Sequence, residues 1–332
     1  MTHLYADSLL TDSLTKFADV VAAVLIFFAV LLIIFFAAGR AAGRLARPAT
    51  IVAFLGPAIL LLLVGLVLPA LRTIVLSVEN DDSTSFIGAK NFQWAFTSDT
   101  IHQVLANTLL WIIVAPVLAT LLGLAMAVLV DRLRNQSVYK SLIFMPMAIS
   151  FVGASIIWKF VYDARDPSLP QIGLLTQIAL WLGVKHPPNW ILDFPLNNFL
   201  LVVIMIWVQT GFAMVVLSAA IKAIPTDILE AVRIDGAQAG QTFFYVTVPM
   251  IRNTLIVVLT TVMITTLKVF DIVRTMTGGN FGTQVLANEM YSQSFVQFNN
   301  GRGAALAVIL FVAVLPLVGY NIVQLRRDRG IR

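Results

Sequence analysis

Apolar runs of about 20 residues constrain the fold of this chain more than any other feature. They recur along its 332 residues and are separated by short polar connections. A helix of about 20 apolar residues crosses the ~30 Å hydrocarbon core of a bilayer. Only 12% of the residues are charged, about half the ~25% usual in soluble domains. We therefore expect an all-α polytopic membrane protein, and the continuous runs argue against a transmembrane β-barrel.

Seven of these runs are long enough to span a membrane, so about seven transmembrane helices are expected. They cover residues of about 18–38, 51–77, 104–130, 141–161, 198–221, 250–272 and 303–325. Pro146 is expected to kink the fourth. The first run could be misread as a signal peptide. The segment before it is not basic and no small-residue cleavage site follows, so we expect a retained span. Without it, six spans would leave both chain ends inside.

The distribution of charge predicts the orientation. Four connections, at 39–50, 131–140, 222–252 and 326–332, hold 13 of the 22 Lys and Arg residues and 5 of the 17 acids. Cytoplasmic loops carry the excess of basic residues, so these four are expected inside, with the N-terminus outside and the C-terminus in the cytoplasm. This topology explains the net charge of +5, and no nucleic-acid partner is expected.

Several kinds of chemistry are not expected of this chain. It has no cysteine, and its three histidines lie far apart, so no metal site is predicted. The nearest string to a phosphate-binding loop, Gly236 to Thr242, lacks the lysine that reaches the phosphates. No catalytic motif is found either. The chain is predicted not to be an enzyme and to bind no cofactor of its own.

The segment from Pro225 to Pro249, PTDILEAVRIDGAQAGQTFFYVTVP, is a mixed polar stretch between two apolar runs. Asp227 and Glu230 have the spacing of a capping box. Gly236 permits a sharp turn, after which a second short helix is expected before Pro249 opens the sixth span. The segment could also be a simple linker that re-enters the membrane.

The spacing within this segment resembles the EAA loop of binding-protein-dependent ABC importer permeases. That family pattern reads EAA, three residues, Gly, nine residues, then I-x-L-P. Glu230, Ala231, Gly236 and Pro249 stand at the matching positions. Three positions depart conservatively from the pattern, namely Val232, Val246 and Val248.

Four further segments resemble the carbohydrate branch of that family. They are FIGAKNFQWAF at 86–96, Asn107-Thr108, KVFDIVRTMTGG at 268–279 and GRGAALAVILF at 301–311. The resemblance covers roughly residues 50–325 and is closest to the larger, first subunit of maltose- and α-glucoside-type permeases. It implies an N-terminal tail and extra helix at 1–50, a six-helix permease domain at 51–325 containing the loop at 222–249, and a basic tail at 326–332.

The resemblance also implies how the chain is driven. The loop would be a coupling helix that docks on a cytoplasmic ATPase, through Glu230, Ala231, Arg233, Asp235, Gly236, Ala237 and Pro249. The implied partners are a second homologous permease, two ATPase subunits that use ATP and Mg, and an extracytoplasmic sugar-binding protein, in the lipid of a bacterial inner membrane. Closure of the ATPases would swing the spans between outward and inward access.

Polar residues inside the spans indicate where a solute could pass. Gln209 lies in the fifth run near Trp207 and Phe212, and Thr261, Thr265 and Lys268 share one helical face of the sixth, with Asp271 one turn further. Together they could bind sugar hydroxyls beside an aromatic platform. Each has a structural alternative. The threonines could bond their own helix, Gln209 could bridge helices, and Lys268 could snorkel or pair with Asp271.

The resemblance to the carbohydrate branch implies import of a sugar, an α-glucoside such as maltose, trehalose or sucrose. Three alternatives remain open at this point. One is a permease of the same class for another solute, such as a polyamine or glycerol phosphate. Another is a membrane anchor or scaffold that transports nothing. The third, an ion-driven transporter, would need buried acids at the membrane midplane, and Asp271 is the only acid near a span.

Overall fold

The computed structural model describes residues 15–36 except 20, 23, 26, 31 and 33, residues 46–166, and residues 168–329. Within these ranges the chain is helical apart from turns and loops, and the single strand-like pairing is an isolated bridge between Glu79 and Phe86. The expected all-α architecture is confirmed. The chain divides into two compact units, residues 1–72 and 73–332.

The first unit is helical over its described residues between 15 and 36 and again from Ala46. Helix α2, Ala46–Leu62, continues through a π-helical turn, η2 at Leu63–Val67, into α3, Leu68–Leu76, which runs past the unit boundary. The expected first span at 18–38 lies partly outside the described residues.

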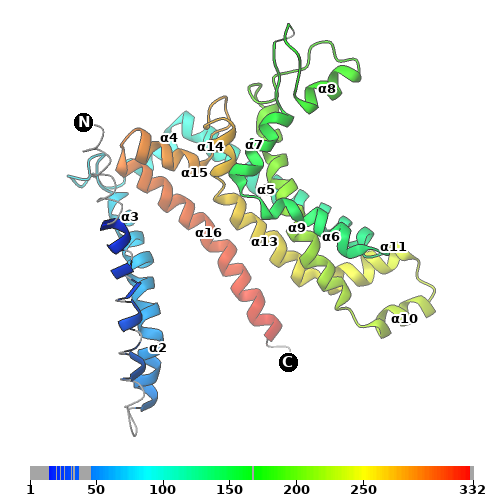
Figure 1. Cartoon of the computed structure of the whole chain (residues 1–332), viewed down its shortest axis with the longest axis horizontal. Helices are drawn as coiled ribbons and strands as arrows, with labels where there is room; N and C mark the ends of the chain where they lie inside the picture. The colour runs from blue at the N-terminus through cyan, green and yellow to red at the C-terminus, as the bar shows by residue number, and fades with distance from the viewer. Residues whose placement is uncertain are drawn as a thin grey trace. The chain divides into compact units, whose positions relative to one another are not determined.

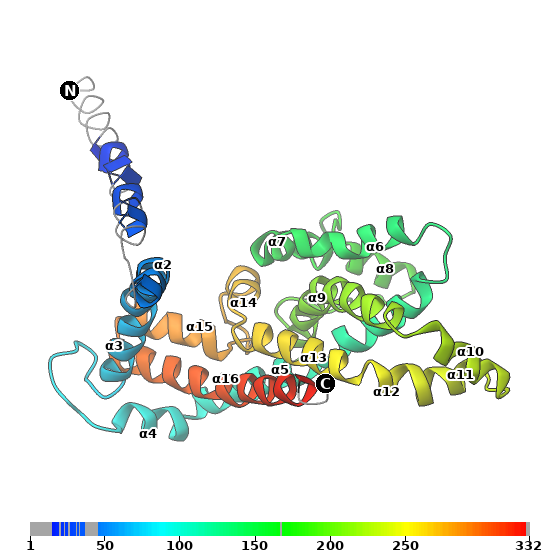
Figure 2. The ribbon, with the colours of Figure 1, turned by 90° about the horizontal axis from the view of Figure 1, so that it is seen from below.

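The second unit holds the other described helices. Their bounds are α4 Lys90–Thr97, α5 Asp99–Val130, α6 Gln136–Phe144, η3 Met145–Ala148, α7 Phe151–Val161, α8 Leu174–Trp181, α9 Leu196–Lys222, α10 Thr226–Ile234, α11 Ala239–Thr242, η4 Phe243–Thr247, α12 Val248–Met250, α13 Arg252–Leu267, α14 Asp271–Met276, α15 Leu286–Tyr291, η5 Ser292–Val296 and α16 Asn300–Arg329. Within this unit α10 and α11 lie at one end, while α4 and α15 lie at the other (Figures 1 and 2).

Four of the described helices are long and apolar enough to cross a membrane individually. They are Phe54–Leu76, Asp99–Val130, Leu196–Lys222 and Asn300–Gln324. Two bent pairs bring the number to as many as six if each pair is one span. The described residues therefore give four to six spans, and the expected count of seven is not confirmed.

The fourth expected span, at 141–161, is broken rather than kinked. Gln136–Ala148 and Phe151–Val161 meet at 100°. Pro146 lies in the 3₁₀ turn η3, after which the backbone is extended at Ile149 and Ser150. The sixth expected span differs as well. Ala239–Met250 and Arg252–Leu267 meet at 68°, and α13 ends at Leu267 instead of continuing to 272.

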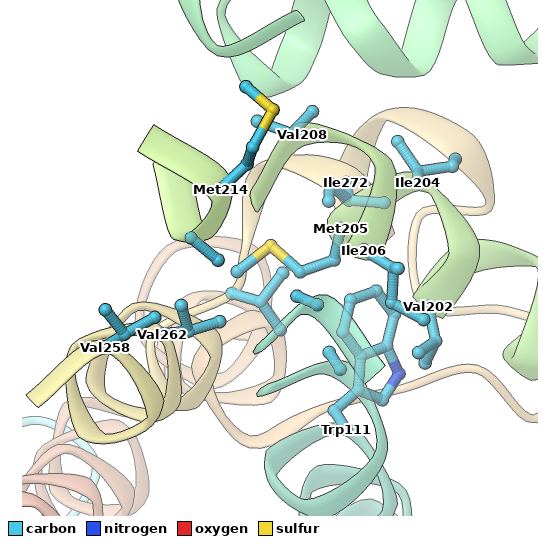
Figure 3. Packing of buried hydrophobic residues seen from close by; sticks show 14 of the residues in the cluster. Trp111, Val202, Ile204, Met205, Ile206, Val208, Met214, Val258, Val262 and Ile272 are labelled. Atoms are coloured by element: carbon cyan, nitrogen blue, oxygen red, sulfur yellow. The ribbon is translucent and has the colours of Figure 1, made fainter. Parts of the chain in front are cut away.

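The core of the second unit forms where α5 packs against α9 and α13. Figure 3 shows Trp111 of α5, Met205 of α9, Val262 of α13 and Ile272 of α14 among the buried side chains of this cluster. Small residues bring α5 and α9 close together: a Cβ on Gly123 would collide with the Cβ of Ala213. Close backbone approach at small residues is how helices pack where lipid replaces water.

Candidate functional site

Gly236 forms the turn of the polar segment between α9 and α13. It joins α10 to α11 with a φ of +77°, and a Cβ at this position would meet no atom within 4 Å. Glycine is therefore needed here for its backbone conformation rather than for space. The amides of Gly236 and Ala237 donate to the carbonyls of Arg233 (3.1 Å) and Val232 (3.2 Å) and end the first helix.

The expected capping box at Asp227 and Glu230 is not formed. Pro225 is the N-cap of α10 and Asp227 lies inside the helix, in its first turn, where its charge complements the helix dipole. A capping box occurs instead at the second helix. There the backbone N–H of Gln238 donates to Oε1 of Gln241 at 2.8 Å. The prediction was wrong because the proline placed the helix start earlier than Asp227.

The outer surface of this segment is exposed and has few partners. Glu230, Ala231, Arg233, Asp235 and Gly236 are exposed, Pro249 is exposed and Ala237 is half-buried. Among the described residues, no ion pair involves Glu230, Arg233 or Asp235. Large apolar side chains also face outward, with Ile234, Phe244 and Tyr245 being 85%, 68% and 79% exposed. This surface has the composition of a docking surface.

Beneath the segment is a cavity of about 380 Å³, which reaches the end of α5. It is lined by Leu229, Arg233 and Phe243 from the segment and by Asp131 and Arg132 from the connection after α5, among others. Asp131 pairs with Lys140 at 2.5 Å and Lys222 at 3.4 Å. Burial raises the pKa of Asp131, but hydrogen bonds from Lys140 and Ser218 and the charges of both lysines outweigh it, so the pKa is lowered.

Four of the residues proposed for a solute path line a single cavity between α9 and α13. Gln209 and Phe212 of α9 face Thr261 and Thr265 of α13 across a space of about 320 Å³. The remaining lining comes from Val208 and from the break between α6 and α7, at Met147, Ile149, Ser150 and Phe151. Sequence reasoning missed the contribution of the break, although Pro146 indicated that the helix is interrupted there.

Gln209 is the polar side chain of this cavity that has no partner. It is 7% exposed and makes no hydrogen bond among the described residues. The threonine hydroxyls donate within their own helix, Thr261 to the carbonyl of Val257 at 2.7 Å and Thr265 to that of Thr261 at 3.0 Å. Their oxygens can still accept a hydrogen bond, while the Gln209 amide can both donate and accept. The cavity therefore presents polar groups suited to a neutral, hydroxyl-bearing solute.

Three other proposed residues do not reach this cavity. Trp207 lines a separate apolar cavity of about 500 Å³ and packs edge-on against Trp158 at 5.7 Å between ring centroids. Lys268 is exposed just beyond the end of α13, and Asp271 begins α14 half-buried. No ion pair joins Lys268 to Asp271 among the described residues. Of the two proposed aromatic platforms, only Phe212 is in position.

The other sequence segments singled out above meet each other in space. The side chain of Asn107 donates to the carbonyls of Gly282 (2.7 Å) and Gln284 (2.9 Å), and Thr108 accepts from the backbone N–H of Leu286 at 2.9 Å. These bonds tie the start of α5 to the glycine-rich loop after α14. Similarly, a Cβ on Gly301 would lie 2.7 Å from the side chain of Asn91. The segments at 86–96 and 301–311 therefore pack together.

Residues 119–329 match the family described as "Binding-protein-dependent transport system inner membrane component". The chain belongs to this family. It is thus one component of a binding-protein-dependent transporter, located in the inner membrane, and the resemblance seen in the EAA loop is confirmed.

Relatives extend the match over most of the chain. It is 49% identical over 279 residues to the osmoprotective compounds uptake permease protein GgtC of Synechocystis sp., covering 84% of this chain and all of that protein. It is 47% identical over 278 residues to the α-glucoside transport system permease protein AglF of Rhizobium meliloti, and the match covers 83% of this chain and 82% of that protein. The trehalose/maltose permease MalF of Thermococcus litoralis is 30% identical over 82% of this chain and 92% of its own length.

The fold also matches a solved transporter. A subunit in the crystal structure of a bacterial ABC transporter involved in the import of the acidic polysaccharide alginate superposes with a TM-score of 0.74. The match covers 85% of this chain and 97% of that one at 20% sequence identity. At this identity the likeness establishes the shared fold alone.

Proposed function

We propose that this permease carries a neutral sugar, an α-glucoside such as maltose, trehalose or sucrose, into the cytoplasm. The observation that carries the proposal is the cavity formed by Gln209, Phe212, Thr261 and Thr265. Sugars are bound by hydrogen bonds to their hydroxyls and by packing of apolar faces on aromatic rings, and this cavity offers both. The relative at 47% identity that is named for α-glucoside transport supports the substrate class.

The lining of the cavity favours sugars over charged solutes. None of its nine lining residues is charged. A polyamine or a glycerol phosphate would enter it with its charge desolvated and unpaired, at a cost of several kcal/mol. Lys268 and Asp271, which could have supplied charges, lie outside it. The alternative of a pure anchor is disfavoured too, because an anchor has no need of a buried, unpartnered amide between its helices.

The energy for transport is proposed to enter through the segment at 222–249. Its exposed acids and apolar side chains suit docking in a cleft of an ATPase subunit, with Glu230 meeting a basic group there. Two ATPases would use ATP and Mg, a second homologous permease would complete the pore, and an extracytoplasmic binding protein would deliver the sugar. We call the segment at 222–249 the docking segment. In this arrangement the docking segment and the C-terminus face the cytoplasm and the N-terminus lies outside.

Uptake of labelled solutes by the assembled transporter in proteoliposomes tests the function. We expect ATP-dependent uptake of at least one neutral α-glucoside and no uptake of sn-glycerol 3-phosphate or spermidine. Preferred uptake of either charged solute would overturn the proposal. Failure to take up any solute, in a complex that hydrolyses ATP when its binding protein is added, would do the same.

One pair of variants tests whether the cavity selects the sugar. Gln209→Leu removes its free amide and should weaken the apparent affinity for the sugar about tenfold. Thr210→Val is the matched control, because Thr210 lines the other cavity and its hydroxyl donates to the Ile206 carbonyl. An equal effect of both variants would contradict a role for this cavity in binding.

A further inference from the structure

Glu289 is a buried carboxylate without a basic partner. It lies in α15 and is 7% exposed. Its two oxygens accept hydrogen bonds from side-chain amides, Oε2 from Gln284 at 2.6 Å and Oε1 from Gln293 at 2.7 Å. No ion pair in the described part of the chain includes it. Two arginines of the same unit contact aromatic rings instead: Arg274 lies over the Tyr291 ring at 4.8 Å, and Arg302 lies over that of Trp94 at 4.5 Å.

Two amide oxygens in the same network also lack donors. Asn288 is fully buried and Gln293 is 4% exposed. Oδ1 of Asn288 and Oε1 of Gln293 have no hydrogen-bond partner. The Gln293 oxygen is bonded to the same carbon as the nitrogen that donates to Glu289. Asn288 joins the network by donating to Oε1 of Gln284.

This network therefore has more hydrogen-bond acceptors than donors. It holds a carboxylate and two unpartnered amide oxygens, all withdrawn from water. A buried carboxylate without an opposite charge is unfavourable even when it accepts hydrogen bonds, and each unsatisfied acceptor adds to the cost. A single proton on Glu289 would neutralise the charge but could satisfy only one further acceptor. A cation can neutralise the charge and accept coordination from several oxygens at once.

We propose that Glu289, Gln293 and Asn288 form a site for a small monovalent cation of the size of Na⁺. One carboxylate balances one positive charge. Ca²⁺ takes six to eight oxygen ligands, usually with several carboxylates, and Glu289 is the only acid in the network. Zn²⁺ and Cu²⁺ prefer nitrogen and sulfur ligands, and among the described residues no group of three or more His, Cys, Asp or Glu side chains gathers.

The location suggests what the ion stabilises. Asn288 also donates to the carbonyl of Gly278 at 3.2 Å, in the glycine-rich loop, and the backbone N–H of Leu286 donates to Thr108 of α5. A cation at Glu289 would therefore hold this loop, α15 and the start of α5 as one rigid group. The proposal is independent of which solute the permease carries.

Thermal unfolding of the purified full transporter in NaCl or choline chloride at equal ionic strength tests the site. Saturating Na⁺ should raise the unfolding temperature of this subunit by about 3–6 °C over choline. Radioactive sodium should bind to one saturable site per chain. A stability that is indifferent to Na⁺ and K⁺, or that responds only to Ca²⁺ or only to pH, would overturn the proposal.

Two variants assign the effect to this network. Glu289→Gln keeps the shape and removes the charge, and should abolish both the thermal shift and sodium binding. Asp99→Asn removes an exposed acid and should leave both unchanged. If Glu289→Gln fails to assemble, Gln293→Met keeps the carboxylate and should weaken sodium binding at least tenfold. Unaltered sodium binding in the assembled variant would refute the site.

Discussion

Asp131 links the ends of three helices of the second unit. It follows α5 and contacts Lys140 of α6 together with Lys222 and Ser218 of α9. The same residue lines the cavity beneath the docking segment. A charge held by three groups on two other helices fixes their relative positions, which gives the docking segment a rigid base.

Replacing Asp131 should therefore destabilise the subunit. Asp131→Asn leaves two lysines facing each other without the acid, at a cost of about 1–3 kcal/mol. Thermal unfolding of the purified transporter at pH 7 measures the loss. Asp99→Asn again serves as the control, and an equal loss in both variants would contradict the structural role of Asp131.

The lowered pKa of Asp131 gives this stabilisation a pH dependence. Because the pKa is lower in the folded state than its usual value of 3.8, the contribution is fully present above that value. It is lost as the pH falls through the folded pKa. The difference in unfolding temperature between wild type and Asp131→Asn should thus be constant from pH 7 to about 5 and shrink below pH 4. A difference that already disappears at pH 6 would contradict this assignment.

The helical repeat of α9 alone predicts that Trp207 does not face the cavity lined by Gln209. At about 100° per residue, Trp207 lies about 160° from Gln209 around α9, whereas Phe212 lies about 60° from it. The shared face of Thr261 and Thr265 was predicted by the same reasoning. Lys268 could not be judged in this way, because the end of α13 at Leu267 depends on packing rather than on local sequence.

At the scale of elements, the close contact of α5 and α9 is set by glycines and alanines. A Cβ on Gly123 would lie 2.8 Å from the backbone nitrogen of Met214 as well as close to Ala213. Gly123→Ala should therefore force the helices apart and cost about 1–3 kcal/mol. Gly319→Ala in α16, where a Cβ would meet nothing within 4 Å, should be neutral or slightly stabilising. Thermal unfolding of both variants checks the contrast, and equal stability would contradict it.

The positions of the long helices follow from hydropathy, but their breaks do not. The spans within α5, α9 and α16 agree with the apolar runs to within a few residues. The 100° break after Pro146 depends on a tertiary contact, since a Cβ on Gly211 of α9 would lie 2.6 Å from the carbonyl of Ile143. A single proline predicts an interruption but not the angle, which is decided by the neighbouring helix.

Substitutions that change the charge or the turn of the docking segment test its proposed role in coupling. Glu230→Lys reverses an exposed charge on α10, and Gly236→Asp places a side chain where φ is +77°. Both should abolish sugar uptake while the subunit stays in the membrane. Uptake assays with immunodetection of the subunit check this, and normal uptake in both variants would refute the coupling role.

At the scale of the whole molecule, residues far apart in sequence form the two regions to which we assign a function. The cavity proposed to hold the solute is lined by α9, α13 and the break between α6 and α7. The docking segment joins α9 directly to α13, so a push on it reaches two walls of the cavity. Since a rigid-body movement of these helices would open the cavity to one side at a time, the connection offers a direct mechanical route.

The central claim is that the sugar occupies the cavity between α9 and α13, and the absence of native cysteines allows a direct test. The rate of thiol modification at Thr265→Cys can be measured in the assembled, transport-active complex with its loaded binding protein. Leu109→Cys, which is exposed on α5, is the control. We predict that a transported α-glucoside slows modification at position 265 at least several-fold and leaves position 109 unchanged. Equal modification rates with and without the sugar at position 265 would contradict the claim.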